Sequence, residues 1–255
     1  MASSHHSRIG RREFLKGAAA LTSLGLSLVT YPRTGHGQPK AGGVMPMAAF
    51  ADPDIWDPHK GGGQAGIQAS SQLYNQLVGW DPANPGKIIG DLAESWAISD
   101  DGSSYTFKLH PNAKWSDGRP VTAEDVTFSL ARIADVGSPR ASMWRTYIES
   151  WEALNPLTVR IKLKSPSAAF LPFLAVDFVK ILPKHVVAAG VDVSKPENIV
   201  GSGPFKFVDW KKGDSYEVTR NSMYFKTGRP YLDGIRHYVI RDKGTLIAAY
   251  KFGEF

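Results

Sequence analysis

The sequence predicts a mixed α/β fold that is rich in antiparallel strand pairs and has few long helices. The segment YTFKLH alternates apolar and polar side chains, which places Tyr105, Phe107 and Leu109 on one face of a strand. The dipeptide Asp101-Gly102 precedes this strand with the chemistry of a tight turn, so the two segments that flank it should form a hairpin. Apolar side chains at helical spacing occur in only a few segments, and these are short.

The first third of the chain predicts one strand, a long loop and one helix. Residues 44–49 begin as a short apolar run, and Asp-Pro pairs and the glycines at 61–63 then indicate a loop. Apolar side chains recur at helical spacing from residue 67 onward, which predicts an amphipathic helix that ends at Gly79. The following segment, DPANPGK, has the composition of a turn.

The remaining elements follow from the same two patterns. Residues 120–135 predict a helix that begins with a capping box, in which Thr122 is the cap and Asp125 takes the usual place of Glu or Gln. The next segment is predicted as a strand with Arg160, Lys162 and Lys164 facing solvent, and residues 168–190 as a buried helix or turn followed by a short strand. After these we expect a strand pair that turns at Lys212-Gly213, a strand at 234–242 and a helix from residue 244.

The first 37 residues predict a twin-arginine signal peptide. Arg11 and Arg12 are followed by Glu-Phe-Leu-Lys and then by an apolar run that ends near Val29, although Gly10 stands where the motif usually has Ser or Thr. That run is shorter than the roughly 20 residues that a bilayer span requires. The alternative is a basic amphipathic surface helix, but the run is apolar all round. We place the start of the mature chain near Gln38, in a bacterial periplasm.

The composition argues against nucleic acid and against a lipid anchor. The formal net charge is +6, but after residue 37 the chain has 25 basic and 23 acidic side chains, and the seven tryptophans have no basic run beside them. The chain has no cysteine, which excludes a lipoprotein anchor and a disulfide framework.

Three blocks of sequence carry a resemblance to a known family. They are DPDIWDPHK, DLAESWAISDDGSSYTFKLHPNAKWSDGRPVTAEDVTFSL and GSGPFKFVDWKKGDSYEVTRNSMYF, in that order. The chain resembles the family 5 extracellular solute-binding proteins, which are the periplasmic peptide, dipeptide and nickel receptors of ABC importers. The similarity extends from about Ala41 to the last residue, and the middle block is long and specific.

The resemblance implies a periplasmic binding protein fold in which two lobes close on a ligand around a hinge. It implies that 41–80 is the first segment of domain I, that 81–164 is an inserted domain II, and that 165–255 is an incomplete return to domain I. Domain III and the last piece of domain I would then be missing, so we expect a truncated fragment of one lobe that is exported poorly. A short one-lobe receptor and a non-functional product are the alternatives.

The resemblance also implies which residues bind the ligand. Gly63 and Gln64 fall in the loop after DPHK, which lines the cleft in peptide receptors of this family; the alternative is a flexible turn. Arg140 stands where those receptors have a Tyr, and a guanidinium can pair bidentately with a carboxylate; the alternative is a solvated arginine. The segment GSGPF at 201–205 lacks phosphate-loop spacing, and His59 has no metal-binding partners in the sequence, so both are expected to be structural.

These observations together predict a binding protein. We expect a monomeric receptor for peptides or peptide-like solutes that delivers its ligand to an inner-membrane ABC permease after export by the twin-arginine machinery. No catalytic group is expected, because no Ser/His/Asp triad order and no cysteine nucleophile are present. No metal or cofactor is expected either, since His59 has no partners with metal-ligand spacing. The alternative from another class is a periplasmic hydrolase with a receptor-like fold.

Overall fold

The computed structural model describes residues 40–61, 63–135 and 139–253. The chain divides into two units, residues 1–39 and 40–255, and the description below concerns the second unit. The predicted signal peptide therefore lies outside the described residues. Within the described part, no helix combines the length and the apolar character that crossing a membrane requires.

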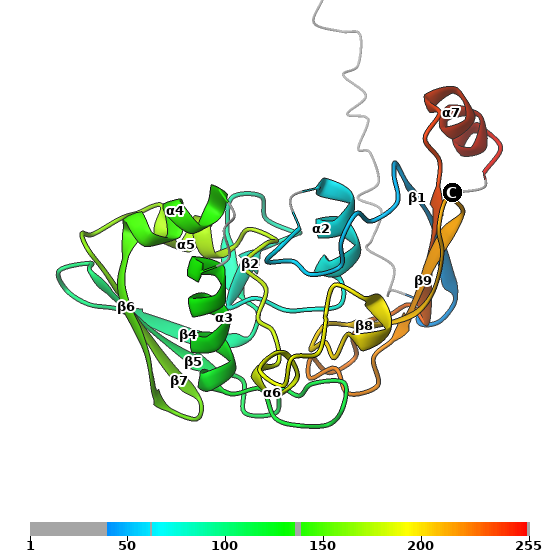
Figure 1. The fold of residues 1–255 in the computed structure, drawn as a ribbon. Coiled ribbons are helices and arrows are strands. Elements are labelled where there is room, and N and C mark those ends of the chain that lie inside the picture. Colours follow the sequence, from blue (N-terminus) through cyan, green and yellow to red (C-terminus); the bar gives the residue numbers. More distant parts are fainter. Residues whose placement is uncertain (1–39, 62, 136–138, 254–255) are drawn as a thin grey trace, which may run out of the picture. The chain divides into compact units, whose positions relative to one another are not determined.

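An antiparallel four-stranded sheet occupies the middle of the chain. Its strand order is β4-β5-β7-β6, with the bounds β4 (Ala93–Ile98), β5 (Ser104–Leu109), β6 (Ile148–Asn155) and β7 (Thr158–Leu163). The predicted alternation is confirmed, because Phe107 and Val159 are fully buried and face each other in the register, whereas Arg160 is exposed. Helix α3 (Ala123–Asp135) contacts β6 and β7, and Figure 1 shows it in green beside this sheet.

A second four-stranded sheet joins the start of the described chain to its end. Its order is β1-β10-β9-β8, and its strands are β1 (Val44–Ala49), β8 (Phe205–Lys211), β9 (Ser215–Arg220) and β10 (Gly234–Val239). Strand β1 is parallel to β10, while the other two pairings are antiparallel. The predicted hairpin of β8 and β9, the strand at β10 and the final helix α7 (Lys243–Lys251) are all present.

Smaller elements complete the described chain. They are α2 (Gln64–Ser71), the paired strands β2 (Val78–Trp80) and β3 (Ile88–Gly90), α4 (Pro139–Tyr147), α5 (Phe170–Leu174), α6 (Lys184–Val187) and the 3-10 helix η1 (Pro196–Asn198). Strands β2, β3 and β6 and helix α4 were absent from the sequence prediction. The two strands β2 and β3 contain three residues each, which is too short for an alternating pattern to be recognised.

The start of α3 uses the predicted pair Thr122 and Asp125 in a modified way. The side chain of Asp125 accepts hydrogen bonds from the backbone N–H of Thr122, at 2.8 Å, and from its hydroxyl, at 3.0 Å. The backbone N–H of Asp125 donates to the carbonyl of Thr122 rather than to its hydroxyl. Of the two reciprocal hydrogen bonds of a capping box, only the one from the backbone N–H of Thr122 to the Asp125 side chain therefore forms. The other carboxylate oxygen of Asp125 accepts from the backbone N–H of Lys184, which ties α6 to α3.

The helix predicted to end at Gly79 is wrong, because α2 ends at Ser71 and Gly79 lies in β2. The residues after Ser71 use their backbone groups to bind distant segments instead of continuing the helix. The carbonyl of Leu73 accepts from Gly203, and the carbonyl of Leu77 accepts from Asp91 and Ala93. The apolar spacing correctly predicted burial, since Leu73 and Leu77 are fully buried. Their burial comes from an extended segment that is hydrogen-bonded to distant parts of the chain, and not from a helix.

The short strand predicted within 168–190 is also wrong. After α5 the chain has no regular structure from residue 175 to 183, and α6 follows. The apolar run is nevertheless buried, as expected, with Val179, Ile181 and Leu182 at most 1% exposed. Its backbone N–H at Ile181 donates to the carbonyl of Asn75, in the extended segment after α2, but the run does not continue into a regular ladder.

One hydrophobic core connects both sheets. Trp56, from the loop after β1, is 1% exposed and packs edge-to-face against Phe207, Trp210 and Tyr216 of β8 and β9. Buried aromatic groups of this kind contribute both apolar area and favourable ring geometry. Trp56 therefore fixes the loop after β1 to the second sheet. This loop leads directly to the predicted ligand-binding residues Gly63 and Gln64.

Candidate functional site

The segment that joins β1 to α2 carries three aspartates, and each binds a different part of the protein. Asp52 accepts hydrogen bonds from the indole of Trp210 at 3.2 Å, from the backbone N–H of Gly213 at 2.8 Å and from Arg241 at 2.8 Å. Burial acts to raise the pKa of Asp52, but the hydrogen bonds from Gly213, Trp210 and Arg241 outweigh it and lower that pKa. Asp52 thus ties the start of the loop to the β8-β9 turn and to the chain after β10.

Asp54 fixes the end of the same loop. Its carboxylate accepts a hydrogen bond from the backbone N–H of Gly63 at 3.2 Å. A β-carbon at Gly63 would lie 2.5 Å from that carboxylate, and one at Gly66 would meet Asp54 and the backbone of Ile55. A side chain at position 63 would therefore displace the Asp54 carboxylate from its hydrogen bond, which gives Gly63 a structural role whether or not a ligand also approaches it.

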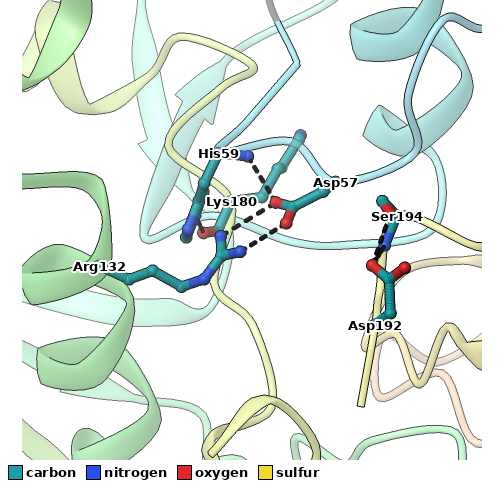
Figure 2. Close-up of polar contacts among 6 residues, drawn as sticks. All are labelled: Asp57, His59, Arg132, Lys180, Asp192 and Ser194. Carbon is teal, nitrogen blue, oxygen red and sulfur yellow. Dashed lines mark hydrogen bonds and ion pairs between the residues drawn. The ribbon is translucent and has the colours of Figure 1, made fainter. Parts of the chain in front are cut away.

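Asp57 forms a buried bidentate ion pair with Arg132 of α3 (Figure 2). The two oxygens of Asp57 lie 2.9 and 2.5 Å from the two terminal nitrogens of Arg132, and the side chains are 1% and 13% exposed. Burial acts to raise the pKa of Asp57, but the hydrogen bonds and the charge of Arg132 dominate and lower it. The planar fork of arginine suits this bidentate geometry, and the pair joins the loop to α3.

His59 extends this cluster to a third segment of the chain. Its backbone N–H donates to Asp57 at 3.0 Å, and its ring Nε2 donates to the carbonyl of Lys180 at 2.7 Å (Figure 2). The ring is fully enclosed, and burial together with the nearby charge of Arg132 lowers the pKa of His59 to about 4. His59 is therefore neutral near pH 7, and its contacts agree with the structural role that the sequence suggested.

Two of the three predicted binding residues, Gly63 and Gln64, are neighbours in the sequence and lie at the start of α2. Gly63 caps the N-terminus of α2 and Gln64 is its first residue, with an exposed side chain. Arg140 lies in the first turn of α4, a helix that packs against α3 and β6, and its side chain lies outside the described part of the protein. The binding role of these three residues remains a prediction.

The segment 201–205 is structural, as expected. The backbone N–H of Gly203 donates to the carbonyl of Leu73 at 2.9 Å, and the hydroxyl of Ser202 accepts from the backbone of Asn75. A β-carbon at Gly201 or at Gly203 would run into the backbone of Leu73. Two chain segments cross here at a distance that only glycine permits, so the glycines serve the crossing rather than a phosphate.

Sequence reasoning missed Asp57 and Arg132, which hold the loop in place. Asp57 stands in an Asp-Pro pair that was interpreted as loop punctuation, and Arg132 is one of several charged residues in a helix. They are 75 positions apart, and no spacing rule connects residues at that separation. The one available signal was the number of acidic residues in DPDIWDP, since three aspartates in seven residues of a partly apolar loop must find partners.

Comparison with known proteins settles the family. The family model described as "Bacterial extracellular solute-binding proteins, family 5 Middle" matches residues 87–255, about two thirds of the chain. The chain belongs to this family. The resemblance and the fold class that the sequence suggested are thereby confirmed.

Curated members of family 5 match a larger part of the chain. The glutathione-binding protein GsiB of Pectobacterium atrosepticum is 34% identical over 201 residues, which are 78% of this chain and 38% of that protein. The oligopeptide-binding protein AppA of Bacillus subtilis is 31% identical over 226 residues, or 86% and 41%. The chain spans about two fifths of the length of these relatives. Their names are those of binding proteins, which supports a non-enzymatic role at the level of the family.

Solved structures of family 5 members have the same fold over the matched part. The Haemophilus influenzae OppA complex with the peptide RPPGFSPFR superimposes with a TM-score of 0.78 at 27% identity, covering 86% of this chain and 45% of that one. AgaA of A. tumefacien R10, in complex with agropinic acid, gives a TM-score of 0.76 at 31% identity and covers 83% and 43%. The domain boundaries at 80 and 164 stay predictions.

Proposed function

We propose that this chain forms a lobe of the substrate-binding component of an ABC importer and captures peptides or peptide-like solutes. Membership of family 5 supports this, as do relatives whose names specify oligopeptides and glutathione. The observation that carries the proposal is the loop after β1. Three aspartates and a buried tryptophan hold it in place, and its end presents Gly63 and Gln64 at the start of α2. Such a fixed loop is suited to binding, because an ordered contact surface loses little entropy when a ligand arrives.

The proposed ligand contacts come from the side chains of Gln64 and Arg140. Gln64 offers both an amide donor and an acceptor to a peptide backbone. Arg140 would pair with a carboxylate, such as the C-terminus of a peptide. Asp54 and Asp57 would not touch the ligand but would fix the backbone that does.

The cellular setting that we propose follows from the sequence. Residues 1–37 would direct export by the twin-arginine machinery, and the receptor would act in the periplasm as a monomer that delivers its solute to an inner-membrane permease. The contacts of the buried histidines give the hydrolase alternative no support. His59 binds a backbone carbonyl and His237 binds the amide of Gln72, so neither is hydrogen-bonded to a hydroxyl nucleophile.

A titration followed by nuclear magnetic resonance tests the proposal. The isotopically labelled chain is titrated with a tripeptide that has a free C-terminus and with the same tripeptide carrying a C-terminal amide. We expect shifts of the Gly63 and Gln64 backbone amides and of the Arg140 side-chain resonance, with the amidated peptide about tenfold weaker because it lacks the charged partner.

Two variants serve as controls in this titration. Arg140→Gln should make the two peptides equal in affinity, whereas Arg145→Gln, in the last turn of the same helix, should leave their difference unchanged. The proposal fails if peptides shift resonances elsewhere but leave Gly63, Gln64 and Arg140 unaffected.

A further inference from the structure

An open pocket lies beside strands β2 and β3. Its volume is about 760 Å³, and the segments that line it include both of these strands, residues 175–180 and residues 224–235. Gly63 and Gln64 do not line it. The volume falls within the range of about 300–1,000 Å³ that is typical of small-molecule sites. Because the pocket is open, a ligand in it can contact only those side chains that solvent also reaches.

Arg229 places a cation without a counter-ion at this pocket. Its side chain is exposed and lines the pocket, and its guanidinium lies over the ring of Tyr231, 4.1 Å from the ring centre. Arginine stacks on an aromatic ring through the face of its guanidinium, which leaves the N–H donors at its edge available. Among the described residues, none forms an ion pair or a hydrogen bond with this guanidinium. An oxyanion in the pocket can therefore accept from its edge.

The other charged side chains that line the pocket are already paired. Lys180 lies 3.2 Å from the carboxylate of Asp177, and Lys226 lies 2.6 Å from that of Asp91. The lining thus has three cations and two carboxylates, and pairing leaves one positive charge, that of Arg229. A ligand with a single negative charge balances it. A second negative charge would be repelled by the two carboxylates that are already present.

The apolar part of the pocket is also accessible. Trp80 of β2 is 47% exposed although it lines the pocket. Ile89, Leu232 and Ile235 line it as well, and each of them is only partly buried. Large exposed aromatic and aliphatic side chains at a concave surface are typical of ligand contact. The pocket therefore offers apolar surface to a ligand in addition to one cation.

The segments that carry Trp80 and Arg229 are connected to each other. Trp80 faces Ile88 of β3 in the register of the two strands, and Asp91 directly follows β3. The ion pair of Asp91 with Lys226 ties this end of β3 to the turn in which the backbone N–H of Arg229 donates to the carbonyl of Lys226 at 3.1 Å. The aromatic ring and the cation are thus held in place before a ligand arrives, which lowers the entropic cost of binding.

We propose that this pocket binds a small monocarboxylic acid with an aromatic or large apolar body. The carboxylate pairs bidentately with the edge of the Arg229 guanidinium, and the apolar body packs against Trp80 and the aliphatic side chains beside it. The site does not depend on the proposed solute-binding function.

Three naphthyl probes that differ in charge test this assignment on the unmodified chain. 2-Naphthylacetate has one negative charge, 2-naphthylacetamide is neutral and nearly the same shape, and 2-naphthyl phosphate is doubly charged above neutral pH. In isothermal titration calorimetry the acid should bind at least about fivefold more tightly than the amide, because only the acid pairs with a guanidinium. The phosphate should bind no more tightly than the acid. The acid should also shift the side-chain resonance of Trp80 in nuclear magnetic resonance spectra.

Variants assign the two contacts separately. Arg229→Gln should make the acid and the amide equal in affinity, and Arg229→Lys, which keeps the charge but loses the planar fork, should retain only part of the preference. Trp80→Ala should weaken both probes and keep the ratio between them. A thermal unfolding transition like that of the unmodified chain shows that each variant is folded.

Arg236→Gln is the matched control. Arg236 also lies over a tyrosine ring, 5.3 Å from the centre of Tyr238, and its loss changes the net charge by the same amount. It follows Ile235 in β10, so its side chain points to the face opposite the one that lines the pocket. The preference for the acid should therefore be unchanged in this variant.

Several results would overturn the assignment. They are equal affinity for the acid and the amide, no binding of 2-naphthylacetate at roughly 10 mM, and a phosphate that binds more than about fivefold more tightly than the acid. Loss of the preference in Arg236→Gln would show that net charge rather than Arg229 causes it. Shifts at Gly63 and Gln64 in place of Trp80 would put the probes in the proposed solute site, which overturns this assignment but leaves the proposed function intact.

Discussion

The sheet β4-β5-β7-β6 and the loop between β1 and α2 are held in place by different interactions. In the sheet, apolar side chains alternate with polar ones, and the inner faces of β5 and β7 are fully buried. In the loop, the backbone has no regular hydrogen-bond pattern, and the carboxylates of Asp52, Asp54 and Asp57 supply the order. The sheet depends on many small apolar contacts, and the loop depends on a few strong polar ones.

This difference predicts how the two regions respond to change. Loss of one methyl group in a sheet removes a fraction of its burial energy, since many neighbours remain. Loss of the Asp57 carboxylate leaves the buried guanidinium of Arg132 without its counter-ion, which is a much larger penalty. The loop should therefore be the region that is more sensitive to single substitutions and to acid.

The largest effect is expected for Asp57→Ala. Removing this carboxylate leaves the guanidinium of Arg132, 13% exposed, without its counter-ion. We expect the free energy of unfolding to fall by about 3–5 kcal/mol, measured by urea denaturation.

The double variant Asp57→Ala with Arg132→Met separates the ion pair from general packing. It should recover a substantial part of the loss, because no unpaired charge remains buried. A loss below about 1 kcal/mol for the single variant would show that the pair does not hold the loop.

Acid should weaken the loop and the β1-β10-β9-β8 sheet before it weakens the other sheet. Burial and the charge of Arg132 lower the pKa of His59 to about 4, and burial does the same for His237 in β10. Between pH 6.5 and about 4 the unfolded chain binds protons that the folded chain does not, so stability is complete above pH 6.5 and falls as the pH decreases.

The expected slope is about 1.4 kcal/mol per pH unit for each of these two histidines. Urea denaturation at pH 7.0, 6.0 and 5.0 measures this slope. His59→Gln should reduce it by about half, because one of the two titrating histidines is removed. Glutamine can still donate to the carbonyl of Lys180, so the hydrogen bond is kept. An unchanged slope in that variant would contradict the assignment of the effect to His59.

A smaller effect is expected in the sheet. Ile161 of β7 is fully buried, and Ile161→Val removes one methylene while keeping the β-branched shape that suits a strand. The free energy of unfolding should fall by about 0.5–1.5 kcal/mol. A loss as large as that of Asp57→Ala would remove the contrast between the two regions.

The smallest effect is expected for an ion pair on the outer face of that sheet. Glu152 and Arg160 are 54% and 46% exposed and lie 2.7 Å apart, a distance close to that of the buried pair. Glu152→Gln should change stability by well under about 1 kcal/mol, because solvent and salt screen exposed charges. Comparison with Asp57→Ala then isolates burial as the cause of the difference.

Local patterns predicted much of the fold from the sequence. The alternation at Tyr105, Phe107 and Leu109, the turn at Asp101-Gly102 and the β8-β9 hairpin depend on neighbouring residues alone, and all three are present. The helix predicted to reach Gly79 was wrong because the carbonyls of Leu73 and Leu77 bind residues far along the chain. No local pattern contains that information.

The candidate site was less predictable for the same reason. The resemblance pointed to the loop after DPHK, but two of the three aspartates that fix this loop, Asp57 and Asp52, have partners 75 to 189 positions away. Gly63 was chosen as a possible close approach to a ligand, and the structure gives Asp54 as the group that approaches it. Position in the sequence located the loop, and only the three-dimensional contacts explained it.

The central claim is that the Asp57–Arg132 pair holds the loop between β1 and α2 in place, while the order of the β4-β5-β7-β6 sheet does not depend on this pair. Amide hydrogen exchange, compared between the unmodified chain and Asp57→Asn under conditions in which both are folded, tests it most directly. We predict that two amides, that of Gly61, which donates to the carbonyl of Asp57, and that of Ile67, which donates to the carbonyl of Gly63, exchange at least about tenfold faster in the variant. Those of Phe107 and Ile161 should keep their rates. Equal acceleration in both regions, or no change at Gly61 and Ile67, would contradict the claim.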